Sequence, residues 1–214
     1  MQRIFVHGLG QTPDSWKRVT ARFGASSHSA CPNLAELSPG NPMTYQRLYQ
    51  AFSEFCGGFP GELDLCGLSL GGVLALNYVI DHPQKVHSLV LIAAPYKMPK
   101  RLLQFQNLLF RMMPKRSFQQ TGFGKEAFLQ LCTSMEPLDF SNSLQAISCP
   151  ALVICGEQDS ANKKAAVELA GILKNAELRL IPGSGHEVNR DAPEALADCL
   201  ADFYRRIPER LGER

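Results

Sequence analysis

Short apolar runs alternate along this chain with longer amphipathic stretches, and that alternation limits the folds open to it. The apolar runs are rich in Val, Ile and Leu, as strands buried on both faces are. They lie at residues 4–6, 63–66, 89–92, 152–155 and 178–181, with a weaker candidate at 26–31. The stretches of helical length lie at 15–23, 44–55, 70–80, 163–173 and 193–206. This order predicts an α/β fold, a mostly parallel sheet of about six strands with helices on both faces.

A sheet of this kind also predicts where a functional site lies. Ligands bind beyond the carboxyl ends of parallel strands, so the residues that directly follow each apolar run are the first candidates. The last helix has its own start signal, because Asp191 is placed to cap it and Pro193 suits its first turn. Glu194, three residues after Asp191, completes a pattern like a capping box.

The alternation stops between residues 95 and 148, where no strand pattern occurs. Apolar residues at helical spacing predict one helix over 99–113 and a second over 125–132. A long segment without strands inside a compact domain is usually a lid or a binding element. We therefore expect a single domain over residues 1–214, with a helical lid inserted at 95–148.

The charge and the hydropathy exclude several classes of protein. The 22 Lys and Arg against 20 Asp and Glu give a net charge of +2, far from the basic footprint of a nucleic-acid-binding protein. No uncharged run is long enough to cross a bilayer, and the start of the chain lacks the pattern of a secretory leader. We expect a cytoplasmic protein without a transmembrane segment and without a nucleic-acid partner.

The cysteines and histidines do not indicate a disulfide framework or a metal site. The seven cysteines are odd in number and form no C-x-x-C pair, so most are expected to be buried, reduced thiols. No two of the five histidines share a helix face beside a carboxylate, as a zinc site would require. We predict neither a metal nor a cofactor. His28, His82 and His87 are expected at the surface or in loops.

The motif G-L-S-L-G at residues 67–71 lies between a predicted strand and a predicted helix. A G-x-S-x-G sequence in this context is typical of a turn that exposes a nucleophilic serine, here Ser69. The serine backbone occupies a strained, sharp turn, and the flanking glycines let strand and helix approach each other. The N–H of Leu70 and the helix dipole then point toward a developing oxyanion. The alternative is that Ser69 is an ordinary turn residue.

A serine hydroxyl is a poor nucleophile unless a base accepts its proton and a carboxylate orients that base. Asp159 follows the run at 152–155, and His186 follows the run at 178–181. The sequence therefore predicts a triad of Ser69, His186 and Asp159 at one edge of the sheet. Two alternatives remain open: His186 as a loop residue bonded to backbone, and Asp159 as a helix cap with Glu157 as the acid.

With these residues the chain resembles the α/β-hydrolase fold superfamily, in its small, esterase-like branch of serine hydrolases. The resemblance covers nearly the whole chain and includes H-G-L-G at residues 7–10 with Trp16 downstream, the motif at 67–72, the segment 150–159, and Gly185-His186 followed by Pro193. It implies that the N–H of Leu9 is the second oxyanion donor and that His7 is a structural hydrogen-bonding group. It also implies that the N-terminal hairpin of many members is missing here.

The hypothesis is therefore a serine hydrolase that cleaves small carboxylic esters through an acyl-enzyme intermediate and needs no cofactor. The same triad also serves other reactions in this superfamily, namely hydrolysis of thioesters, lactones or carbon–carbon bonds, and cofactor-free lyase chemistry. A non-catalytic ligand-binding protein of the same fold is a third possibility. Neither the natural substrate nor the oligomeric state follows from the sequence.

The predicted lid suggests a substrate pocket. Its apolar positions are candidates for lining an acyl pocket, or they fill the gap between lid and core. They are Leu102, Phe105, Leu109, Met112 and Met113, together with Leu103 and Leu108. Residues 97–126 include seven basic side chains and only one acidic side chain. These charges either attract an anionic substrate or an acidic surface, or they form a solvated lid face.

Overall fold

Six strands form one sheet in the computed structural model, which describes residues 1–24, 28–38, 40, 42–98, 107 and 109–207. The strands are β1 (Gln2–Val6), β2 (Ser29–Ala30), β3 (Leu63–Leu68), β4 (Val86–Ile92), β5 (Ala151–Gly156) and β6 (Ala176–Ile181). Their order is β2-β1-β3-β4-β5-β6, and every neighbouring pair is parallel. The predicted α/β class and the expected six strands are confirmed.

Helices fill the connections between the strands, mostly where the sequence predicts them. They are η1 (Pro13–Trp16), α1 (Lys17–Thr20), η2 (Ala21–Phe23), α2 (Leu34–Leu37), α3 (Tyr45–Gly57), α4 (Leu70–Asp81), η3 (Pro83–Lys85), η4 (Lys115–Thr121), α6 (Lys125–Met135), η5 (Leu144–Ala146), α7 (Ser160–Ile172), α8 (Val188–Asp191) and α9 (Pro193–Arg206). The single helix expected over 15–23 is instead three short pieces. One cause is Thr20, whose hydroxyl donates to the carbonyl of Trp16 and competes with regular helical bonding.

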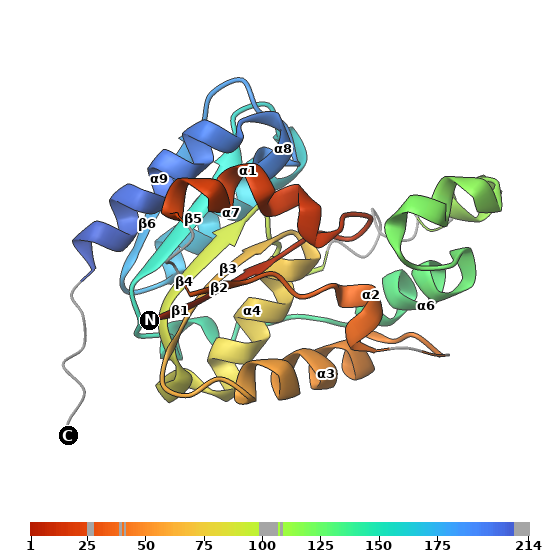
Figure 1. Cartoon of the computed structure of the whole chain (residues 1–214), viewed down its shortest axis with the longest axis horizontal. Coiled ribbons are helices and arrows are strands. Elements are labelled where there is room, and N and C mark those ends of the chain that lie inside the picture. Colours follow the sequence, from red (N-terminus) through yellow and green to blue (C-terminus); the bar gives the residue numbers. More distant parts are fainter. Residues whose placement is uncertain (25–27, 39, 41, 99–106, 108, 208–214) are drawn as a thin grey trace.

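The sheet is covered on both faces, and its side chains alternate between two cores. Ile4 and Val6 of β1 pack in the core that includes α3, α4 and α7, whereas Phe5 packs with Trp16 in the core that includes α1 and α9. Figure 1 shows α1 and α9 on one side of the sheet and α3 and α4 on the other. Every residue of β3, β4 and β5 is buried, as continuous apolar runs in a parallel sheet require.

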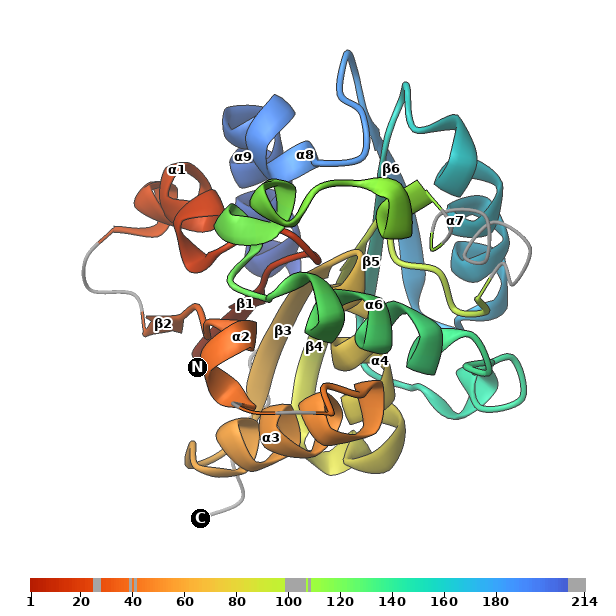
Figure 2. The same cartoon turned by 90° about the vertical axis from the view of Figure 1, so that its right-hand side faces the viewer.

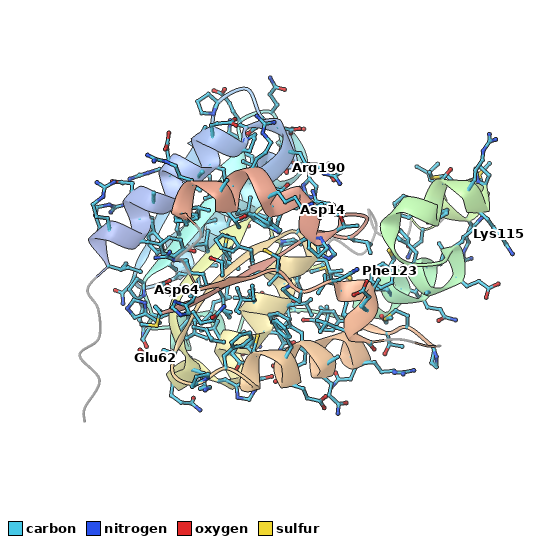
Figure 3. All side chains as sticks on the ribbon, viewed as in Figure 1. Asp14, Glu62, Asp64, Lys115, Phe123 and Arg190 are labelled. Atoms are coloured by element: carbon cyan, nitrogen blue, oxygen red, sulfur yellow. The ribbon has the colours of Figure 1, made fainter. Side chains whose placement is uncertain are left out.

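One buried polar cluster was not expected from the sequence. His87 is not a surface or loop residue, because it lies inside β4 with its Nδ1 2.8 Å from Asp64 Oδ1. Asp64 also accepts from the Ser88 hydroxyl at 2.6 Å and lies 3.7 Å from the guanidinium of Arg3. A buried carboxylate needs such partners. Figure 3 shows Asp64 at the end of the sheet opposite the β4–β5 connection.

The connection between β4 and β5, residues 93–150 and here called the insert, contains η4, α6 and η5. Its described residues form no strand apart from an isolated bridge between Lys97 and Asp139. Most of the helix predicted over 99–113 lies outside the described residues, although 109–112 are helical. Figures 1 and 2 show the insert beyond one end of the sheet, with α6 above α3.

Two side chains of α6 fasten the insert to the start of α3. The Ser134 hydroxyl accepts from the backbone N–H of Tyr45 at 2.8 Å, and Gln130 Oε1 accepts from that of Met43 at 3.0 Å. These backbone groups lie at the N-terminus of a helix, where N–H donors lack partners within the helix. The insert therefore supplies hydrogen bonds that α3 does not make by itself.

The cysteines are packing residues, as expected. Five of the seven free thiols are buried and two are half-buried. Burial raises the pKa of Cys56 and of Cys132 to about 12, so these thiols stay protonated at neutral pH and are poor nucleophiles.

Candidate active site

Ser69 occupies the sharp turn between β3 and α4. Its φ of +52° and ψ of −116° are unfavourable for a residue with a side chain. Two backbone hydrogen bonds hold it there: its N–H donates to Ile92 at 2.8 Å, and its carbonyl accepts from Val73 at 3.0 Å. Ser69 is the N-cap residue of α4, but its hydroxyl makes no capping bond. The hydroxyl is therefore not used to stabilise the helix.

The flanking glycines are required by close backbone contacts. A Cβ on Gly67 would lie 2.3 Å from the carbonyl oxygen of Gly71, and a Cβ on Gly71 would lie 2.2 Å from that of Val6. Both distances are far below van der Waals contact. The expectation that these glycines let strand and helix approach is confirmed.

Two backbone N–H groups are available close to Ser69. Leu70 is the first residue of α4, and neither its N–H nor that of Leu9 has a hydrogen-bond acceptor among the described residues. The turn that carries Leu9 runs beside the serine, because a Cβ on Gly8 would lie 3.5 Å from Ser69 Cβ. Both groups are thus free to donate to a bound oxyanion, and the N-terminus of α4 adds its dipole.

His7 is a structural residue of this turn. Its Nδ1 donates to the Gly8 carbonyl at 2.9 Å, and its Nε2 accepts from the N–H of Leu34 at 3.2 Å. Burial lowers the pKa of His7, which favours the neutral imidazole that this arrangement needs. Both ring nitrogens are occupied, so His7 is a poor proton shuttle, as the sequence suggested.

Asp159 and His186 meet at the carboxyl ends of β5 and β6. His186 Nδ1 lies 2.9 Å from Asp159 Oδ2. The carboxylate is 5% exposed and the imidazole 45% exposed. The two loops are pressed together, since a Cβ on Gly156 would lie 2.0 Å from the carbonyl of Gly185. With its Nδ1 proton donated to the carboxylate, the imidazole keeps a lone pair on Nε2.

Asp159 is the N-cap residue of α7, and the same carboxylate contacts His186. Its carboxylate accepts from the backbone N–H of Asn162 at 3.2 Å and from Asn162 Nδ2 at 3.0 and 2.9 Å. Asn162 was not singled out from the sequence, although it stands three residues after the acid, as in a capping box. Glu157 accepts from Gly183 N–H at 3.4 Å, and among the described residues it forms no hydrogen bond or ion pair with His186.

The structure does not join all three predicted catalytic residues. Among the described residues, neither the hydroxyl of Ser69 nor Nε2 of His186 has a hydrogen-bond partner. Such bonds are often long in unliganded enzymes and shorten when substrate binds.

Asp191 does not cap the last helix. Ala192 is the N-cap residue of α9 and makes no side-chain cap bond. Asp191 instead belongs to the one-turn helix α8, and its carboxylate accepts from the N–H of Gly185 at 2.9 Å. Glu194 pairs with Arg18 at 2.7 Å. The expected cap is wrong because the chain has already turned into α8, and the carboxylate is drawn to the loop of His186.

The expected acyl-pocket residues fall into two groups. Leu102, Leu103, Phe105 and Leu108 lie outside the described residues. Leu109, Met112 and Met113 are 46%, 78% and 39% exposed, and they do not line the pocket described below. A broad apolar stripe on a helix does not reveal which of its sides is covered, so the sequence could not place these side chains.

A pocket of about 610 Å³ lies instead between α2 and the insert. Its apolar lining includes Met43, Phe118 and Phe123, and its charged lining includes Lys115, Lys125 and Glu126. Figure 3 shows Phe123 on the side of the insert that faces α2 and Lys115 on its outer side. The wall formed by α2 adjoins the predicted oxyanion turn, since Leu34 bonds His7.

In the described ranges, no three His, Cys, Asp or Glu side chains are grouped as metal ligands would be. None of the helices in these ranges has the length and apolarity needed to span a membrane.

A sequence model described as "Alpha/beta hydrolase family" matches residues 4–199. The chain belongs to this family. One relative is monoacylglycerol lipase abhd6-B of Xenopus laevis, 21% identical over 94% of this chain and 74% of that protein.

Solved structures show the same fold at low identity. A thermophilic esterase from Thermogutta terrifontis has a TM-score of 0.78 at 18% identity, covering 97% of this chain and 90% of the esterase. The enol-lactonase from Burkholderia xenovorans LB400 has a TM-score of 0.81 at 17% identity, covering 95% of this chain and 91% of the lactonase.

The contact at Gly71 predicts a large loss of stability on substitution. Gly71→Ala should lower the free energy of unfolding by at least about 2 kcal/mol, because its methyl group would collide with the β1 backbone. Gly171→Ala in α7, where a Cβ meets nothing within 4 Å, should change it little or raise it by up to about 1 kcal/mol. Urea denaturation measures both, and equal midpoints for Gly71→Ala and wild type would contradict the contact.

The lowered pKa of His7 predicts a loss of stability in acid. Below the ordinary value of 6.5 the unfolded chain binds a proton that the folded protein resists, so the free energy of unfolding falls as the pH drops. The loss ends below the folded pKa. His7→Gln can still accept from Leu34 and does not titrate. Its free energy of unfolding should therefore depend less on pH than that of wild type between about pH 7 and pH 5. The same pH dependence in both proteins would refute the lowered pKa of His7.

Proposed function

We propose that this protein is a serine hydrolase that cleaves small carboxylic esters, with Ser69 as nucleophile, His186 as base and Asp159 as the acid that orients it. The observation that carries the proposal is the 2.9 Å bond between Asp159 and His186, formed at the same edge of the sheet as the strained Ser69 turn. A loop histidine with only a structural role has no need of a buried carboxylate as partner.

In the proposed reaction, His186 Nε2 accepts the proton of Ser69 as its oxygen attacks the ester carbonyl carbon. The negative charge that forms on the carbonyl oxygen is accepted by the N–H groups of Leu9 and Leu70. Asp159 stabilises the imidazolium through Nδ1. The tetrahedral intermediate then collapses, the carbon–oxygen bond to the alcohol breaks, and His186 returns the proton to the leaving oxygen.

Water completes the cycle. His186 removes a proton from a water molecule as that water attacks the acyl group on Ser69, and a second oxyanion forms at the same two N–H groups. Collapse releases the acid and returns the proton to Ser69. The backbone constraint on Ser69 lowers the cost of each attack, because the hydroxyl needs no rearrangement of the turn.

The pocket between α2 and the insert is our candidate for holding part of the substrate. Its volume of about 610 Å³ falls within the range of pockets for small molecules. Met43, Phe118 and Phe123 offer an apolar lining, and Lys115 and Lys125 place positive charge at its wall. We infer an ester with an apolar part of modest size, for which a negatively charged group elsewhere in the molecule is favourable.

The names of the relatives favour an ester substrate over the other substrate classes. A monoacylglycerol lipase and an esterase both act on esters by their names. The enol-lactonase breaks an ester closed into a ring, and the same residues would serve that reaction. The protein should therefore be assayed with thioesters, lactones and substrates of carbon–carbon bond hydrolases as well as with simple esters. Turnover of one of these compounds, with no turnover of simple esters, would replace the ester proposal.

A fluorophosphonate tests the serine without a choice of substrate. The wild-type protein should gain the mass of one phosphonyl group as Ser69 Oγ displaces fluoride, and Ser69→Ala should gain none. Intact-mass spectrometry measures both, with circular dichroism as the control for folding. A folded wild-type protein that stays unlabelled would refute the activated serine and favour a ligand-binding role.

The acid is tested by two matched carboxamide variants. Asp159→Asn should lower kcat for a 4-nitrophenyl ester by about a hundredfold to ten-thousandfold, because the imidazole loses the partner that orients it. Glu157→Gln, on the same loop, should stay within about twofold of wild type. The reverse order of the two losses would assign the acid to Glu157 and overturn the role of Asp159.

A further inference from the structure

Two buried amide side chains join the turn that carries Leu9 to the helix α8. Gln11 and Asn189 are each 1% exposed. Gln11 Nε2 donates to Asn189 Oδ1, and Asn189 Nδ2 donates to Gln11 Oε1, both at 3.1 Å. The partners stand 178 positions apart in the sequence. Each amide thus satisfies a donor and an acceptor of the other in a place from which water is excluded.

Gln11 also fixes the turn next to Ser69. Its Oε1 accepts from the N–H of Gly8 at 3.3 Å, and its backbone N–H donates to the Gly8 carbonyl at 3.1 Å. Both polar backbone groups of Gly8 are therefore bonded to one residue. Leu9 follows Gly8 directly, so the direction of the Leu9 N–H depends on where Gln11 is held.

Asn189 lies three residues after His186, in a helix that is bonded to the loop of the base. Asp191, in the same turn of α8, accepts from the N–H of Gly185 at 2.9 Å. The helix α8 also packs against η1, which begins two residues after Gln11. Figure 3 shows Asp14 of η1 and Arg190 of α8 at the same end of the molecule.

We propose that the Gln11–Asn189 pair is a positioning device that sets the distance between the Leu9 N–H and the imidazole of His186. This inference rests on the proposed function, in which both groups must act in the same step. In that reaction the Leu9 N–H binds the carbonyl oxygen while His186 takes the proton of the attacking Ser69. The two groups come from the loops after the first and the last strand of the sequence. Within the described residues, the pair makes the only side-chain hydrogen bonds between residues 8–11 and α8.

The alternative is that the pair stabilises the fold and does nothing for the reaction. The two roles predict different behaviour when the amides are removed together. A buried amide without a hydrogen-bond partner is destabilising, whereas two apolar side chains in its place leave no polar group of the pair unpaired. The double apolar variant should therefore be more stable than Gln11→Met, but it cannot restore the bond from Gly8 to Gln11.

The experiment compares Gln11→Met, Asn189→Leu and the double variant. Each single variant should lower the Tm and lower kcat for a 4-nitrophenyl ester by about tenfold to a hundredfold, with KM within about twofold. The double variant should have a higher Tm than Gln11→Met, because no unpaired Asn189 amide remains, while kcat stays low. If a single variant does not fold, the double variant decides the question alone. Recovery of kcat together with Tm would overturn the proposal.

Asn175→Leu is the matched control. Asn175 Nδ2 donates to the Ser148 carbonyl at 2.7 Å, at the opposite end of β6 from the loop of His186. This variant also loses an amide bond between distant segments, yet its kcat should equal that of wild type. An equal loss in Asn175→Leu and Asn189→Leu would show a general effect of stability and would overturn the positioning role.

A second readout does not depend on turnover. In a ¹H–¹⁵N spectrum of Asn189→Leu, the backbone amide signal of Leu9 should shift, although the substitution is on the other loop. An unchanged Leu9 signal would refute the inference. Absence of ester turnover in wild type would instead refute the proposed function, so the two failures can be told apart.

Discussion

The contact between backbone atoms at the start of α4 is the constraint on which the rest of the site depends. The helix lies so close to β1 and β3 that no side chain fits at Gly67 or Gly71. That closeness forces Ser69 into a conformation with positive φ, which costs free energy that the surrounding core must supply. It also brings the first turn of α4 and the turn of residues 7–10 to the same serine. The site is therefore a product of tight packing between layers, and loop chemistry alone could not create it.

The opposite side of the site is built from polar contacts. The loops after β5 and β6 are joined by the bond between Asp159 and His186 and by the close approach of Gly156 and Gly185. Asn162 adds donors to the carboxylate, so the acid is held from two directions. Rigid backbone packing thus fixes Ser69, the proposed nucleophile, whereas a hydrogen-bond network orients His186, the proposed base. The sheet and the contacts of α8 join the two halves.

The sequence predicts those parts that depend on periodicity and on short motifs. Apolar runs gave the six parallel strands, and the glycines around Ser69 gave the strained turn, because both arise from local chemistry. Asp159 and His186 were predictable because a parallel sheet gathers the residues that follow its strands. The pairing of Gln11 with Asn189 leaves no spacing signal, since amides at distant positions pair only after the chain has folded. Asp64 and His87 were hidden for the same reason, within runs that are otherwise apolar.

Asp159 has two partners, and this couples the site to the integrity of a whole helix. Its carboxylate holds His186 and also closes the first turn of α7, so a chain in which α7 is unformed also lacks a fixed acid. The remaining site groups come from the loops after β1, β3 and β6, whose order in space depends on long-range pairing of strands. If the proposed function holds, unfolding of α7 alone should abolish turnover. The rate of ester hydrolysis would then report the fraction of molecules in which this helix is formed.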